Sequence, residues 1–354
     1  MMPPPYTTHN VVEAEPAPTG GHYLRRFPRA IRAALSPLGC MVAEESAGVE
    51  IRFVTEGHGF CLTLGAEPSC LNPAENNGLD VFIFRGDFFH AHRQVEAGRA
   101  NHIVINDIGG ALSERLGRLA PAAFAGRRFS PEVWRVVIGR FPASLIELST
   151  HGKPCRAPYP EELPTRRWLA YGSSITNGAG ASAHHLSYIY QAAHLLGVDV
   201  YNQGLSGSCR CEAEVAEYFA SRADWDLITL ELGVNMRAEC TPEEFEQRAG
   251  HLVRTVRKAH PTKPIALISI YPNAETTLFT SYPETLNALR QSAFDKALER
   301  IAAESCAHLI KGDEILRNFG NLTTDLIHPS DYGHIEMGRN LAAHLGLLLE
   351  QDPT

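Results

Sequence analysis

The second half of the chain alternates between short apolar runs and longer amphipathic stretches, and this alternation restricts the folds available to it. The apolar runs occupy residues 168–171, 198–202, 226–232, 264–271 and 308–310. The amphipathic stretches, which predict helices, occupy residues 184–196 and about 210–222, 242–259, 284–304 and 331–349. A strand that is apolar on both faces must be covered on both, so this pattern predicts a parallel sheet between two layers of helices.

The first half of the chain shows a different pattern. Short segments of alternating or apolar residues lie at 49–54, 60–64, 79–84, 102–105, 133–138 and 144–148. Such spacing, with an Asn-Asn-Gly turn signal at 76–78, predicts an antiparallel β-sandwich. Prolines at 154, 158, 160 and 164 cannot donate ladder hydrogen bonds, which places a domain boundary there. We therefore expect a flexible arm over residues 1–22, a β-sandwich over 23–158 and an α/β domain over 159–354.

Composition excludes several classes of protein. The 354 residues carry 32 Lys and Arg against 40 Asp and Glu, and the acidic excess lies after residue 160, which disfavours a nucleic-acid partner. No apolar run reaches the ~18 residues that cross a bilayer, so no membrane partner is expected. No secretory signal is evident, which predicts a cytoplasmic protein. The eight cysteines lack the spacing of a zinc site, and no metal or cofactor is expected. The oligomeric state is left open.

Glycine and polar residues follow several of the predicted strands. The motifs are Gly172-Ser173-Ser174-Ile175-Thr176, Gly204-Leu205-Ser206-Gly207, Gly233-Val234-Asn235 and Asp325-Leu326-Ile327-His328. Reactive loops of a parallel sheet lie at the carboxyl ends of its strands, so we expect these motifs to meet at one edge.

These motifs contain the groups that acyl transfer requires. A serine hydroxyl needs a base to accept its proton, which His328 can supply for Ser174. Asp325 can orient the imidazole and stabilise its charged form. The backbone N–H groups of Ser174 and Gly207 and the side-chain amide of Asn235 can donate hydrogen bonds to the oxyanion of a tetrahedral intermediate. The sequence thus predicts a serine-dependent acyl hydrolase.

The four motifs, in this order, resemble the SGNH (GDSL-type) hydrolase superfamily over roughly residues 165–350. The resemblance implies a flavodoxin-like, three-layer α/β fold. It also implies that Ser174, Asp325 and His328 are catalytic and that Ser174, Gly207 and Asn235 form the oxyanion hole. The chain has Ser173 where the superfamily often has Asp, and the adjacent Ser173 is therefore the alternative nucleophile.

The first half carries a shorter resemblance. Gly78-Leu79-Asp80-Val81-Phe82 is similar to a Gly-x-Asp-Leu-Tyr motif in the jelly-roll-like β-sandwich that precedes some members of the superfamily. Those two-domain members are similar to carbohydrate acetyl esterases. The resemblance implies a carboxylic ester hydrolase that removes short-chain acyl groups, O-acetyl above all, from a small-molecule or oligosaccharide ester. A broader lipase or thioesterase, and a carbohydrate-binding protein with an inert hydrolase domain, are the alternatives.

Overall fold

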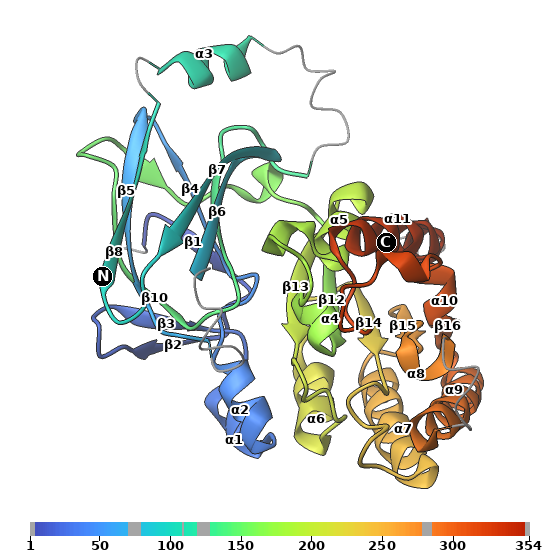
Figure 1. Ribbon diagram of the computed structural model, residues 1–354. Coiled ribbons are helices and arrows are strands. Elements are labelled where there is room, and N and C mark those ends of the chain that lie inside the picture. Colours follow the sequence, from blue (N-terminus) through green and yellow to red (C-terminus); the bar gives the residue numbers. More distant parts are fainter. Residues whose placement is uncertain (1–3, 70–78, 108–109, 119–127, 278–284, 351–354) are drawn as a thin grey trace. The chain divides into compact units, whose positions relative to one another are not determined.

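The computed structural model describes residues 4–69, 79–107, 110–118, 128–277 and 285–350 (Figure 1). The chain forms two compact units. One unit contains Met1–Pro28 and Ala43–Thr165, and the other contains Arg29–Val42 and Arg166–Thr354. The fold class is the expected one, an α/β unit with a parallel sheet and a separate antiparallel β unit.

The antiparallel unit consists of two sheets. One has the strand order β1-β4-β9-β6-β7, with β11 paired to β4, and the other has the order β2-β3-β10-β5-β8. The strands are β1 (Thr7–His9), β2 (Glu13–Pro16), β3 (His22–Arg25), β4 (Glu50–Thr55), β5 (Gly59–Ala66), β6 (Leu79–Arg85), β7 (Phe88–Val95), β8 (Ala100–Asn106), β9 (Trp134–Ile138), β10 (Ala143–Ser149) and β11 (Cys155–Arg156). Apolar side chains from both sheets, including Phe53 and Phe60, share one core. The unit also contains helix α3 (Ala111–Gly117) and the 3-10 helix η3 (Pro160–Glu162).

The limits of the units differ from the expected domain limits. Residues 4–22, expected within a flexible arm, contain β1 and β2, which pair with β4 and β3. The expected boundary at 158/159 lies before the structural one at 165/166, because the carbonyl group of Glu162 still accepts a hydrogen bond from the N–H of Ser130 at 3.0 Å. The predicted turn at 76–78 lies outside the described residues.

The parallel sheet of the other unit has the strand order β13-β12-β14-β15-β16. Its strands are β12 (Arg167–Gly172), β13 (Asp199–Gly204), β14 (Leu227–Glu231), β15 (Ile265–Ile268) and β16 (His308–Ile310). The longer helices are α5 (Tyr188–Leu196), α6 (Ala213–Ser221), α7 (Pro242–Ala259), α9 (Leu286–Ser305) and α11 (Asp331–Glu350). Each of these elements overlaps a predicted one. Numbered from β12 as the first strand, this order is 2-1-3-4-5, which is the flavodoxin-like order. The strand order reverses next to β12, which is the topological switch point of the sheet.

Helices cover both faces of this sheet. Ala170 of β12 lies in an apolar cluster with residues of α5 and α11. The next residue, Tyr171, packs its ring against Phe219 of α6, with 5.2 Å between ring centroids. Neighbouring side chains of a strand point to opposite faces. It follows that α6 and α11 lie on opposite faces of the sheet.

Short helices fill several connections of this unit. They are α1 (Arg29–Ala34), α2 (Pro37–Ala43), α4 (Ser174–Asn177), η4 (His184–Leu186), α8 (Ala274–Thr277), α10 (Gly312–Ile315) and η5 (Phe319–Asn321).

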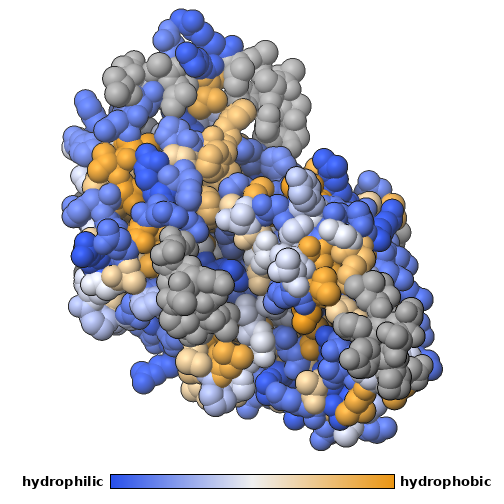
Figure 2. Space-filling model, viewed as in Figure 1, coloured by the Kyte–Doolittle hydropathy of each residue, from blue (hydrophilic) through white to orange (hydrophobic). Residues whose placement is uncertain are grey.

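Figure 2 shows a face of the molecule on which hydrophilic residues predominate and apolar residues form small groups. Within the part of the chain that the structure describes, no helix combines the length and the apolar character needed to span a membrane.

Candidate active site

The first motif places two adjacent serines in different surroundings. Ser173 is the N-cap of α4, and its hydroxyl accepts a hydrogen bond from the N–H of Ile175 at 3.2 Å. Ser173 is fully buried, whereas Ser174, the first residue of the helix, is partly exposed. The Ser173 hydroxyl therefore caps the helix inside the protein, whereas Ser174 is partly open to solvent.

Ser174, His328 and Asp325 form a hydrogen-bonded row. Oγ of Ser174 lies 2.7 Å from Nε2 of His328, and Nδ1 of His328 lies 2.7 Å from Oδ2 of Asp325. The other carboxylate oxygen of Asp325 accepts the N–H groups of Ile327 and His328 at 2.9 Å each and the hydroxyl of Thr323 at 2.8 Å. Partial burial opposes ionisation, but the hydrogen bonds from His328 and these neighbours outweigh it and hold the pKa of Asp325 well below its usual range.

The loop that carries Asp325 and His328 has an unusual backbone. Leu326, between them, has a φ of 57°, in the left-handed region that residues other than glycine seldom adopt. Its N–H donates to the carbonyl group of Thr323 at 2.9 Å, and its own carbonyl group accepts the N–H of Ala274 at 3.0 Å. The N–H of Thr323 donates to the carbonyl group of His328 at 2.8 Å. These bonds hold a tight turn that brings two side chains three residues apart onto the same side.

The loop after β13 is hydrogen-bonded to the turn that carries Ser173 and Ser174. The N–H of Leu205 donates to the carbonyl group of Gly172 at 2.8 Å, and the amide of Asn177 donates to the Ser206 hydroxyl at 3.0 Å. Gly207 follows with a φ of 67°, a conformation that glycine adopts without strain. The loop thus reaches the end of β12 where Ser174 stands.

Asn235 is oriented by the same loop. Its Oδ1 accepts the N–H of Cys209 at 3.1 Å, which leaves the NH₂ group of the side chain as the donor on the other side of the amide. Asn235, Gly207 and Ser174 are all partly exposed and follow the neighbouring strands β14, β13 and β12. The structure therefore brings the predicted residues to the same end of the sheet.

The sequence did not predict the buried carboxyl group that contacts the turn of Ser173 and Ser174. Glu231, the last residue of β14, is 1% exposed. Its Oε2 accepts the N–H of Ser173 at 2.6 Å and the hydroxyl of Thr176 at 3.1 Å, and the same Thr176 hydroxyl lies 2.7 Å from that of Tyr188. Burial raises the pKa of Glu231 to about 7, against the opposing effect of these hydrogen bonds. The one hint in the sequence is a charged residue at the end of a mainly apolar strand, and it does not reveal the contact with Ser173.

Comparison with known proteins identifies the family. The profile of the GDSL-like lipase/acylhydrolase family matches residues 165–345, half of the chain. The chain belongs to this family. The resemblance drawn from the four motifs is thereby confirmed, and so is the expectation of an ester hydrolase. No curated protein matches this GDSL-like hydrolase.

Solved structures share the fold of the GDSL-like hydrolase over most of its length. The salicylyl-acyltransferase SsfX3 from a tetracycline biosynthetic pathway is 17% identical, with a TM-score of 0.78 and coverage of 98% of this chain and 96% of its own. A protein from Bacteroides ovatus named as a GDSL-like lipase is 20% identical, with a TM-score of 0.71 and 98% coverage of both chains. A family two carbohydrate esterase from Clostridium thermocellum, in complex with cellohexaose, is 14% identical, with a TM-score of 0.59 and coverage of 86% and 93%.

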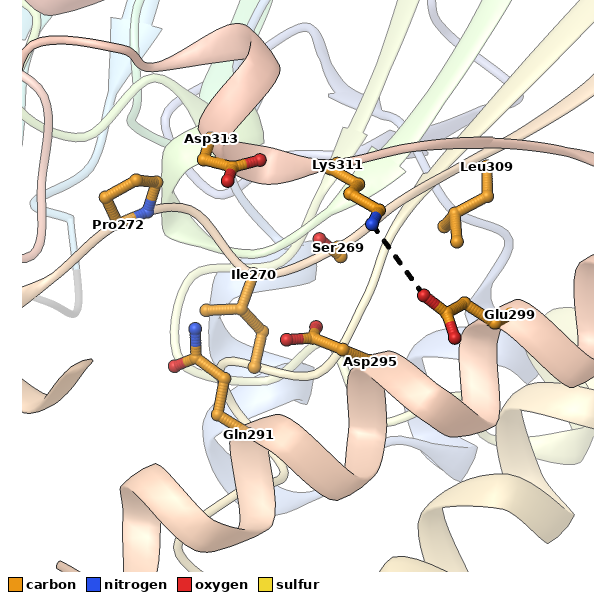
Figure 3. Close-up of a pocket in the computed structure, with 9 residues that line it drawn as sticks. All are labelled: Ser269, Ile270, Pro272, Gln291, Asp295, Glu299, Leu309, Lys311 and Asp313. Carbon is orange, nitrogen blue, oxygen red and sulfur yellow. Dashed lines mark ion pairs between the residues drawn. The ribbon is translucent and has the colours of Figure 1, made fainter. Parts of the chain in front are cut away.

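The GDSL-like hydrolase also has a polar pocket of about 340 Å³ that contains none of the motif residues (Figure 3). Side chains from α9 and from the ends of β15 and β16 line it, among them Asp295, Glu299 and Lys311. Burial raises the pKa of Asp295 to about 6, and nearby carboxylates add to this effect. Lys311 lies 3.8 Å from Glu299, the ion pair drawn in Figure 3.

Proposed function

We propose that the protein is a serine esterase that removes short-chain acyl groups, acetyl above all, from hydroxyl groups of a carbohydrate. The observation that carries the proposal is the row of two 2.7 Å contacts from Ser174 through His328 to Asp325. A hydroxyl, an imidazole and a carboxylate in this order are the parts needed to activate a serine.

The proposed reaction has two halves. Oγ of Ser174 attacks the ester carbonyl carbon while its proton moves to Nε2 of His328, and the carbonyl oxygen becomes an oxyanion. The N–H groups of Ser174 and Gly207 and the NH₂ of Asn235 donate hydrogen bonds to it. The intermediate expels the alcohol, which takes the proton from His328, and the acyl group stays on Ser174. Water then repeats the attack, giving up a proton to His328, and releases the acid and the free serine.

The carbohydrate part of the proposal is supported by two features. The family two carbohydrate esterases share the two-part architecture, and one of them binds cellohexaose in its solved structure. The Leu79–Phe82 part of the sandwich motif lies on β6, within the antiparallel unit. Both features favour a saccharide as the alcohol part of the ester.

The test is acetate release from a panel of acetylated mono- and oligosaccharides, by wild type and by Ser174→Ala. We expect release by the wild type that Ser174→Ala abolishes while its far-ultraviolet circular dichroism is unchanged. A profile of nitrophenyl esters from acetate to decanoate separates a short-chain esterase from a lipase or thioesterase. Glycan binding without any hydrolysis by the wild type would support an inert hydrolase unit instead.

Acyl transfer to an alcohol other than water is a second candidate, favoured by the 98% and 96% coverage of the SsfX3 comparison. The chemistry of the first half-reaction is the same, and only the acceptor in the second half differs. Adding a sugar or phenolic alcohol to a reaction with nitrophenyl acetate distinguishes the two. A transferase gives acetylated alcohol at the expense of free acetate, whereas a hydrolase gives acetate throughout.

A further inference from the structure

A segment from the first half of the sequence belongs to the hydrolase unit. Residues 29–42 lie between β3 and β4 of the antiparallel unit, yet they fold with the residues after 166. They form α1 and most of α2, and α1 packs against α6 (Figure 1). The chain therefore leaves the antiparallel unit, adds two short helices to the hydrolase unit and returns.

The segment is attached next to the oxyanion loop. Oγ of Ser36 lies 2.6 Å from Oγ of Ser208, the residue after Gly207. The Ser36 hydroxyl also accepts the N–H of Gly39 at 3.1 Å, which fixes the start of α2. A Cβ atom on Gly39 would lie 2.6 Å from the Ser208 hydroxyl, so the close approach depends on glycine at this position.

Leu38 is the side chain that this attachment places over Gly207. Its Cδ2 atom lies 2.8 Å from the position that a Cβ atom on Gly207 would occupy. Both residues are partly exposed. An isobutyl group thus borders the backbone that we propose as an oxyanion donor, and a substrate bound there meets an apolar surface.

The alcohol side and the acyl side of the proposed site can be told apart, because the leaving alcohol must receive a proton. Nε2 of His328 delivers this proton, so the alcohol part of the ester lies on the side of His328, just before α11. Leu38 belongs to the segment that packs on α6, and α6 and α11 lie on opposite faces of the sheet. The acyl part of the ester therefore extends towards Leu38.

We propose that Leu38 is a specificity-determining residue that forms an apolar wall of the acyl site and limits the length of the acyl group. The inference rests on the proposed function, because it assigns the acyl side from the roles of Ser174 and His328. A leucine side chain at this distance leaves room for a small acyl group beside Gly207. Removing its branched end adds space on the acyl side alone.

The experiment measures kcat/KM of wild type, Leu38→Ala and Leu38→Phe for nitrophenyl acetate, butyrate and hexanoate. One methylene group in an apolar site changes kcat/KM about 10-fold or more. We expect Leu38→Ala to raise the hexanoate-to-acetate ratio by at least about 10-fold and Leu38→Phe to lower the butyrate-to-acetate ratio. Met41→Ala, at an exposed position of the same segment, is the matched control and should leave both ratios unchanged.

A second series keeps the acetyl group and varies the alcohol, from methyl to nitrophenyl to a sugar hydroxyl. Leu38 variants should preserve the wild-type order in this series. The proposal would be overturned if the kcat/KM ratios between acyl chains were unchanged in both Leu38 variants. It would also be overturned if the variants changed the order of the alcohol series instead. Either result is compatible with Ser174-dependent hydrolysis. Failure of the proposed function itself would give a different result. Wild type and Met41→Ala would then hydrolyse the esters no faster than Ser174→Ala. In that event a series of fluorophosphonates of increasing chain length tests Leu38 directly, and labelling rates independent of Leu38 would reject its role.

Discussion

Glu231 makes the stability of the hydrolase unit depend on pH. Its pKa is about 7 in the folded protein, against an ordinary value of 4.5. Between these values the folded state holds a proton that the unfolded state releases, so the free energy of unfolding falls as the pH rises. This contribution is fully present below pH 4.5 and is lost as the pH rises through 7. The difference corresponds to roughly 3 kcal/mol, because one pKa unit is worth about 1.4 kcal/mol.

Substituting Glu231→Gln removes the titration and keeps an acceptor for Ser173 and Thr176. The amide NH₂ takes the place of Oε1, a buried oxygen without a hydrogen-bond partner, so the variant loses stability at low pH. We expect its free energy of unfolding, relative to wild type, to rise by roughly 3 kcal/mol between pH 4.5 and pH 8.5.

The assay is urea unfolding followed by circular dichroism at steps of half a pH unit. The two units can unfold separately, and the relevant transition is the one whose midpoint the substitution moves. Glu217→Gln, at an exposed position of α6, serves as the control and should give a difference curve that is flat across the range. An equally flat curve for Glu231→Gln would refute the reasoning from burial to pKa.

The other predictions concern the proposed catalytic groups. Asp325→Asn keeps a carbonyl oxygen but turns an NH₂ towards His328, which favours the wrong tautomer, and kcat for acetate release should fall about 10³–10⁴-fold, less than for His328→Ala. Asn235→Ala removes one oxyanion donor, and kcat should fall about 10²–10³-fold with KM little changed. Ser173→Ala should cost about 1 kcal/mol of stability in urea unfolding and retain acetate release, whereas an inactive Ser173→Ala beside an active Ser174→Ala would reverse our assignment of the nucleophile.

The α/β half could be predicted well because its signals are local and agree with one another. The helix predicted at 242–259 is α7, Pro242–Ala259, whose start is set by Thr241. The Thr241 hydroxyl accepts the N–H of Glu244 at 3.2 Å, and the Glu244 carboxylate accepts the N–H of Thr241 at 2.9 Å. Strand order and the common edge of the motifs then follow from general rules for parallel sheets.

The features that could not be predicted from the sequence depend mainly on contacts between residues far apart in the chain. Strand β7, Phe88–Val95, was missed because only one of its eight residues is buried and its polar residues break the alternation. Residues 29–42 carry no local sign that they leave the antiparallel unit, since their partner Ser208 lies about 170 residues further on. Glu231 looks like an ordinary strand residue until the fold places Ser173 against it.

The hydrogen bonds of the turn after β12 show what Ser173 does at a position where the resemblance to the SGNH superfamily would favour Asp. The Ser173 hydroxyl caps α4, and its N–H finds an acceptor in Glu231 on the neighbouring strand. A carboxylate at 173 would stand beside that of Glu231 in a buried place, and two like charges there disfavour each other. The neutral Ser173 avoids this repulsion and lets the buried carboxyl group of Glu231 accept the N–H of the turn.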